Sequence, residues 1–168
     1  MLFRSVPIPV VIAGSPSFRD GFNGDGGPAI SALLRGPEGI ALAPNGDIYF
    51  VDAGNRRLRR IDSAGIITSV AGNGEIESVA SDGPITSAVL SEPSRVAIDA
   101  QSNIFVTEGL SRSLRLGGGR IRRISGGRID TIAGLTISGF GGDGGSADRK
   151  STRLNSSHLR LSRMPSSA

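Results

Sequence analysis

The sequence predicts an all-β fold made of repeated four-stranded antiparallel sheets. The chain holds 25 Gly and 9 Pro among 168 residues, well above average usage, so turns must be frequent. It also repeats itself, because a shift of 56 residues aligns Pro37 with Pro93 and a shift of 63 aligns 59–61 with 122–124. Asn-Gly and other turn signals divide each repeat into short apolar runs, which is typical of β-hairpins.

Turn signals separate four strands within the first repeat. An Asn-Gly turn at 44–46 ends the first strand, and a Ser-Ala-Gly turn at 63–65 precedes the fourth. Leu58 and Ile61 are three residues apart and cannot share a face of a regular strand, so a β-bulge is expected between them. The strands are predicted at residues 39–43, 47–52, 57–62 and 66–71.

The second strand of this repeat is apolar on both of its faces. Ile48 and Phe50 point to one side, whereas Tyr49 and Val51 point to the other. A strand of this kind is typical of a sheet that is buried on both sides.

Small sheets with two buried faces suit radial stacking, as in the blades of a β-propeller. The repeat predicts blades at about 37–72 and 93–134 within a folded segment 1–147, and a shift of 118 aligns 21–29 with 139–147. Partial units therefore flank the two blades. Because a closed ring typically needs about 4 to 8 blades, we expect about two complete blades of an incomplete propeller, a fragment whose other blades belong to a longer protein.

Residues 148–168 differ from the rest of the chain. They are rich in Ser, Arg and Leu, and the net charge of +4 resides there, since 1–147 hold 14 Arg and 14 acidic residues. The string from Asp148 to His158 resembles a common sequencing adaptor translated in one reading frame. We interpret this segment as a disordered artefact, and a genuine Ser-rich disordered tail is the alternative.

Composition excludes several classes of function. Zero Cys excludes a disulfide framework and a thiol nucleophile, and no apolar stretch is long enough for a membrane span. The neutral charge of 1–147 argues against nucleic acid and anionic membranes as partners.

A series of motifs follows in a fixed order along the chain: the glycine-rich 21–29, Pro37-x-Gly39-Ile40-Ala41, Gly46-Asp47-Ile48-Tyr49, Asp52-x-x-Asn55-x-Arg57-Leu58 and Val70-Ala71-Gly72-Asn73-Gly74. Together these motifs resemble the NHL-repeat family, in its bacterial and teneurin-like variety. The second unit retains Pro93 and Arg122 but has Glu108 in place of Asp52. The resemblance covers about 10–147 and implies a propeller of the six-bladed kind, a scaffold on which unrelated functions occur.

The glycine-rich motif partly matches two ligand-binding signatures, a dinucleotide fingerprint and a calcium loop. Pro28 interrupts the first, and the second lacks two carboxylate ligands. We expect a structural turn in which the glycines supply positive φ and Asp25 accepts hydrogen bonds from neighbouring amides. The residues are Gly24, Asp25, Gly26 and Gly27, with a recurrence at Gly142 and Asp143.

Asp52, Asn55 and Arg57 form a second structural candidate. A carboxylate and a guanidinium five residues apart are expected to clamp the turn between two strands, with Asn55 capping the backbone. Catalysis is disfavoured because no His, Lys or Cys accompanies them. No residue is assigned a catalytic, cofactor-binding or metal-binding role.

The second repeat carries a seven-residue insertion within 109–119. Its arginines suit an acidic protein surface or a polysaccharide, and loops of this kind commonly carry binding. An unselected solvated insertion is the alternative. The candidate binding residues are Arg112, Arg115 and Arg120.

These observations favour a non-catalytic binding or structural module that binds a protein or polysaccharide. The family resemblance implies a secreted or cell-surface location within a larger protein. One alternative is a fragment of a propeller lyase or metal-dependent lactonase with its catalytic residues in missing blades, for which Glu38 and Glu92 are the carboxylates of interest. Another is an RNA-binding NHL domain that uses its arginines on phosphates.

Overall fold

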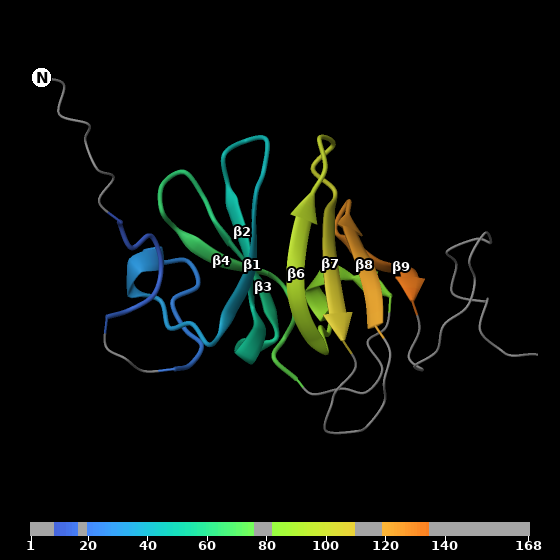
Figure 1. Ribbon diagram of the computed structural model, residues 1–168, viewed down its shortest axis with the longest axis horizontal. Helices are drawn as coiled ribbons and strands as arrows, with labels where there is room; N and C mark the ends of the chain where they lie inside the picture. Colours follow the sequence, from blue (N-terminus) through green and yellow to red (C-terminus); the bar gives the residue numbers. More distant parts are fainter. Residues whose placement is uncertain (1–8, 17–19, 76–81, 110–118, 135–168) are drawn as a thin grey trace, which may run out of the picture.

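The computed structural model describes residues 9–16, 20–75, 82–109 and 119–134. This part of the chain forms nine strands and three single turns of 3₁₀-helix, with no α-helix among them (Figure 1). The strands are β1 (Pro37–Leu42), β2 (Ile48–Asp52), β3 (Arg57–Ile61), β4 (Ile67–Ala71), β5 (Gly83–Pro84), β6 (Glu92–Ile98), β7 (Ile104–Gly109), β8 (Gly119–Ser125) and β9 (Arg128–Gly134). The 3₁₀ turns are η1 (Ala29–Ser31), η2 (Ala53–Asn55) and η3 (Ile85–Ser87).

The strands form two antiparallel sheets, which confirms the all-β fold class. Sheet 1 has the order β1-β2-β3-β4, as predicted. Sheet 2 has the order β5-β9-β8-β7-β6, so it contains a fifth, two-residue strand that the repeat pattern did not predict. Pro84 of β5 occupies the repeat position of Pro28, which makes an isolated bridge to Ile66 beside sheet 1. Each sheet is thus preceded by an outer segment that runs into a 3₁₀ turn.

Local turn chemistry fixes the register within sheet 1. Gly46 adopts φ 88° in the turn between β1 and β2, and Gly65 adopts φ 77° in the turn between β3 and β4, conformations that glycine accepts without steric cost. The pairing of β3 with β4 shifts between Leu58 and Arg59, but the extra residue is Val70 of β4, and β3 pairs with β2 without a shift, so the bulge predicted within the third strand lies in its neighbour. Leu58 and Ile61 lie on opposite faces of β3, as regular alternation requires, and belong to different core clusters.

The main core lies between the two sheets, with β1 beside β6 (Figure 1). Sheet 1 contributes Val51, Leu58 and Ala71, and sheet 2 contributes Ile104, Val106, Ile124 and Ile129. A second cluster covers the opposite face of sheet 1. It consists of Phe50, Ile61 and Ile67 with Ala29 and Ala32 of the preceding segment. Sheet 1 is therefore apolar on both faces, as its second strand predicted.

Sheet 2 differs from that prediction, because the residues that the structure describes form an apolar cluster on only one of its faces. Ile104 and Val106 of β7 are buried against sheet 1, whereas Phe105 between them is half-buried and Ile121 of β8 is 38% exposed. These two side chains lie on the face of sheet 2 that points away from sheet 1, since neighbours along a strand alternate between faces.

Several sequence predictions fall outside the described residues. They concern the tail 148–168, the glycine-rich recurrence at Gly142 and Asp143, and the loop residues Arg112 and Arg115. Among the residues that the structure describes, no helix is long and apolar enough to span a membrane.

Candidate functional site

The carboxylate of Asp52 is the centre of a buried polar cluster at the end of β2. Its Oδ1 accepts a hydrogen bond from the backbone amide of Arg35 at 2.8 Å. Its Oδ2 accepts from Asn55 Nδ2 at 2.9 Å and from Arg59 Nη1 at 3.2 Å. The side chains of Asp52 and Arg59 are both fully buried, so their charges neutralise each other away from water.

The predicted clamp between Asp52 and Arg57 is wrong. Arg57 donates instead to the backbone carbonyls of Asn55 at 2.9 Å and Asn73 at 2.6 Å, and its guanidinium lies 3.6 Å from the centroid of the Phe22 ring. Arg57 and Arg59 are two residues apart and share a face of β3, but only Arg59 reaches the carboxylate. Asn55 does contact Asp52, yet its amide also donates to the carbonyl of Gly21 at 2.6 Å rather than capping the turn.

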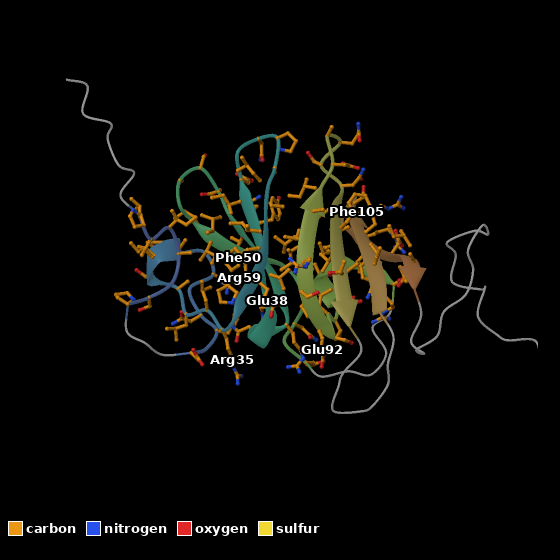
Figure 2. The ribbon with its side chains drawn as sticks, viewed as in Figure 1. Arg35, Glu38, Phe50, Arg59, Glu92 and Phe105 are labelled. Carbon is orange, nitrogen blue, oxygen red and sulfur yellow. The ribbon has the colours of Figure 1, made fainter. Side chains whose placement is uncertain are left out.

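Arg59 also binds the glycine-rich motif to sheet 1. Its Nη2 forms an ion pair with Asp25 Oδ1 at 2.9 Å and donates to the carbonyl of Asn23 at 3.2 Å. The prediction that Asp25 accepts from neighbouring turn amides is therefore wrong, because its carboxylate pairs with a strand residue 34 positions away. Figure 2 shows Arg59 near the labelled Phe50 on sheet 1.

Two glycines of this motif have the positive φ that was predicted. Gly24 adopts φ 88° and Gly26 adopts φ 81°. Gly27 does not have a positive φ, so the prediction is wrong for this residue. A Cβ on Gly24 would lie 2.8 Å from the Cβ of Ala32, so the close approach of the motif to η1 also requires glycine at this position.

The second unit builds the same cluster with a longer acid. Glu108 Oε2 accepts from the amide of Ser91 at 2.9 Å, and Glu108 Oε1 accepts from Arg122 Nη1 at 2.6 Å. Arg122 Nη2 also pairs with Asp82 Oδ1 at 3.5 Å. The acid at 52 and 108 and the arginine at 59 and 122 therefore occupy equivalent repeat positions, whereas the second acid, Asp82, aligns with Gly26, one position beyond Asp25. The signal for this cluster was the alignment of Arg59 with Arg122 together with an acid at 52 and 108.

Arg120 does not present its charge to a ligand, which corrects its assignment to the binding loop. It lies on β8, its side chain is only 5% exposed, and its Nη2 lies 3.1 Å from Glu108 Oε1. Burial lowers the pKa of Arg120, as does the neighbouring charge of Arg122, while Glu108 acts in the opposite direction. Burial, followed by the charge of Arg59, lowers the pKa of Arg57 in the same way.

These clusters are suited to holding backbone segments in place. A guanidinium cannot act as a general base, and the oxygens of Asp52 already accept three hydrogen bonds. Glu38 at the start of β1 is exposed and Glu92 at the start of β6 is half-buried (Figure 2). Within the described ranges, no group of three or more His, Cys, Asp or Glu side chains could hold a metal ion.

Comparison with known proteins places this geometry among propeller repeats. A family model described as the Teneurin NHL domain matches residues 13–86. These residues include the first glycine-rich motif, sheet 1 and the start of the second unit. The chain resembles teneurin-type NHL repeats.

The relatives extend this NHL-type resemblance beyond the matched segment. Teneurin-3 of Mus musculus is 32% identical over 110 residues, which cover 58% of this chain. Teneurin-3 of Danio rerio is 49% identical over 53 residues, or 32% of this chain. The matched part of this chain spans only 4% of the length of the Mus musculus relative and 2% of the length of the Danio rerio relative.

Solved structures give weaker similarities. A Bacteroides thetaiotaomicron protein of unknown function aligns at 19% identity and a TM-score of 0.44, covering 52% of this chain and 21% of the other. A streptogramin B lyase aligns at 20% identity and a TM-score of 0.39, covering 58% and 26%.

Proposed function

We propose that this chain is a non-catalytic NHL-type propeller segment that serves as a binding or structural module of a larger cell-surface protein. Its match to the Teneurin NHL domain and the small share of the relatives that it covers support this reading. The number of blades, the extracellular location and the identity of the ligand are parts of the proposal.

The buried charged side chains of the two clusters support a non-catalytic role. Asp25, Arg59 and Asp52 neutralise one another and fix the glycine-rich motif and the segment before β1. Glu108, Arg122 and Asp82 do the same in the second unit. Side chains that satisfy one another are unavailable to a substrate, so these clusters favour a scaffold over a catalytic site.

The proposed ligand is a protein or an acidic polysaccharide, bound through the insertion that carries Arg112 and Arg115. A loop that extends from paired strands such as β7 and β8 is a common place for recognition. RNA is disfavoured as the partner, because 1–147 is neutral and contains Phe and one Tyr but no Trp for base stacking.

A binding experiment tests this function. The purified chain is immobilised and exposed to extracellular proteins, heparin and single-stranded RNA at physiological salt. We expect binding to a protein or to heparin, with at least a tenfold loss in Arg112→Ala/Arg115→Ala, equivalent to about 1.4 kcal/mol. Arg123→Ala is the matched control, because Arg123 is an exposed arginine on β8 that pairs loosely with Asp130 at 3.7 Å.

Two outcomes would contradict the proposal. The first is preferential binding to RNA. The second is metal-dependent hydrolysis of lactones that is lost in Glu38→Gln, which would make the chain part of an enzyme.

A further inference from the structure

The two sheets meet through faces that differ from each other. Sheet 1 presents Tyr49, Val51 and Leu58 to the interface, and we call this side of a sheet its trailing face. Sheet 2 presents its leading face, which includes Val96 and Ile98 of the inner strand β6. The contact is therefore heterologous, with the trailing face of one unit against the leading face of the next.

The leading face of sheet 1 is partly open. Ile40 and Leu42 of β1 are 67% and 70% exposed, although they occupy the repeat positions of Val96 and Ile98, which pack into the main core. Ile40 pairs with Phe50 across the strands, and Leu42 pairs with Ile48. The exposed pair thus continues the apolar face that the second cluster begins.

The trailing face of sheet 2 is also partly exposed in the described part of the chain, where Ile121 is 38% exposed and Phe105 is half-buried. Phe105 takes the repeat position of Tyr49, and Ile121 takes that of Leu58, which is completely buried in sheet 1. The chain therefore carries, at its two ends, both halves of the interface that it already forms internally.

A short segment shows what the leading face of sheet 1 accepts. Residues 12–14 read Ile-Ala-Gly, like 132–134 at the end of β9 and the similar 70–72 at the end of β4. Ala13 packs on the second cluster as Ala71 does on the main core. Residues 12–14 therefore occupy the position that the last strand of a preceding unit would take. Within the described residues, no equivalents of the other strands of such a unit pack on this face.

We propose that a second copy of this chain docks head to tail, with the trailing face of its sheet 2 on the leading face of sheet 1. Phe105 and Ile121 of one copy then cover Ile40 and Leu42 of the other, in continuity with the interface between the two sheets. The end of β9 takes the place of residues 12–14, which give up the packing of Ala13 and the hydrogen bond from the amide of Gly14 to the carbonyl of Ala29, whereas the neighbouring Val10 and Val11 are already 78% and 64% exposed. Repetition of a heterologous contact closes a ring of blades when the rotation allows it.

Light scattering and sedimentation of the full chain test the association. The average mass is expected to rise above that of the monomer as the concentration increases from about 1 to 300 µM. Leu42→Glu should abolish association by removing the leading contact, and Ile121→Glu should abolish it by removing the trailing contact. Ala64→Glu is the control, since Ala64 is exposed in the turn between β3 and β4, away from both faces.

Mixing the two variants distinguishes head-to-tail docking from other contacts. Each variant alone should be a monomer, whereas an equimolar mixture should give 1:1 dimers and nothing larger, because only one intact pair of faces remains. The formation of dimers also shows that both variants are folded. A wild-type chain that stays monomeric over the whole range would overturn the proposal, as would a single variant that still associates like the wild type.

Discussion

Asp52 and Arg59 form an ion pair of 3.2 Å in which both side chains are completely buried. The pair joins the end of β2 to the middle of β3. The Asp52 carboxylate also accepts a hydrogen bond from the backbone amide of Arg35. Removing Asp52 would leave the buried guanidinium of Arg59 with the partly exposed Asp25 as its counter-ion, and losing one partner of a buried pair is far more costly than the net value of the pair.

Asp52→Asn is therefore expected to lower the free energy of unfolding by about 3 kcal/mol or more. Asp130→Asn is the matched control, because the ion pair of Asp130 with Arg123 is 3.7 Å long and partly exposed, and its loss should cost less than about 1 kcal/mol. Urea denaturation of the two variants measures the difference. Equal destabilisation would show that the Asp52 pair contributes no more than a surface pair.

The ring of Phe22 is predicted to stabilise the chain through two guanidinium groups. Arg57 lies 3.6 Å and Arg59 4.9 Å from its centroid, close enough for a cation–π interaction. Phe22→Leu should cost about 1 kcal/mol, while Phe22→Tyr, which keeps the ring, should remain within about 0.5 kcal/mol of the wild type. Thermal unfolding provides the comparison, and a leucine variant as stable as the tyrosine variant would contradict it.

Two glycines with the same φ are expected to respond differently to alanine. Gly46 and Gly72 both adopt φ 88°, but a Cβ on Gly46 meets nothing within 4 Å, whereas one on Gly72 would overlap the carbonyl of Arg56. Gly46→Ala should cost about 1 to 2 kcal/mol from backbone strain alone. Gly72→Ala should cost clearly more, because the strands must also move apart.

Chemical denaturation of both alanine variants tests that difference. Similar denaturation midpoints for Gly46→Ala and Gly72→Ala would contradict the prediction. They would mean that the backbone at Arg56 and Gly72 separates without loss of stability. Gly134 makes the equivalent approach to Gly119 in sheet 2, so Gly134→Ala should behave like Gly72→Ala.

Asp99 is predicted to make stability fall at acid pH. The side-chain hydrogen bond from Asn103 is the main cause that lowers the pKa of Asp99, helped by the amides of Asn103 and Gln101. Because the pKa is lower in the folded state, this contribution is present above the unfolded value near pH 4 and is lost as the pH falls through the folded value.

A carboxyl NMR titration measures this shift directly. The midpoint of Asp99 should lie below that of a peptide containing residues 97–105, and Asn103→Ala should raise it toward the peptide value. Gln101→Ala retains the backbone donor and should leave the midpoint unchanged. A midpoint in the folded chain equal to that of the peptide would refute the prediction.

The strands of sheet 1 could be predicted from sequence because their limits depend on local turn chemistry. Residues 57–62 were expected for a strand that runs over Arg57–Ile61, and the neighbouring strands differ by similar amounts. Asn45 and Gly46 identify one turn, and Gly65 identifies another. The short β5 was missed, since two residues that include Pro84 carry no strand pattern of their own.

The partners of the buried arginines could not be predicted in the same way. Arg57 and Arg59 have the same side chain on the same face of one strand, so spacing from Asp52 does not decide which of them reaches it. Asp25 joins Arg59 only because the glycine-rich motif folds back onto sheet 1, a contact between distant parts of the chain. The repeat does not decide between them either, because Arg57 aligns with Arg120 as Arg59 aligns with Arg122, and both arginines of the second unit contact Glu108.

Because the two sheets differ in how many of their faces are covered, their strands should differ in the free energy of local opening. Strands β2, β3 and β4 of sheet 1 each contribute side chains to both apolar clusters, whereas β7 and β8 of sheet 2 contribute only to the cluster between the two sheets. Amide protons of β2 should therefore exchange with solvent deuterium only through nearly complete unfolding, and those of β8 through smaller fluctuations. Exchange rates would then rank the strands by their distance from the shared core, with protection declining from β2 toward the outer side of sheet 2.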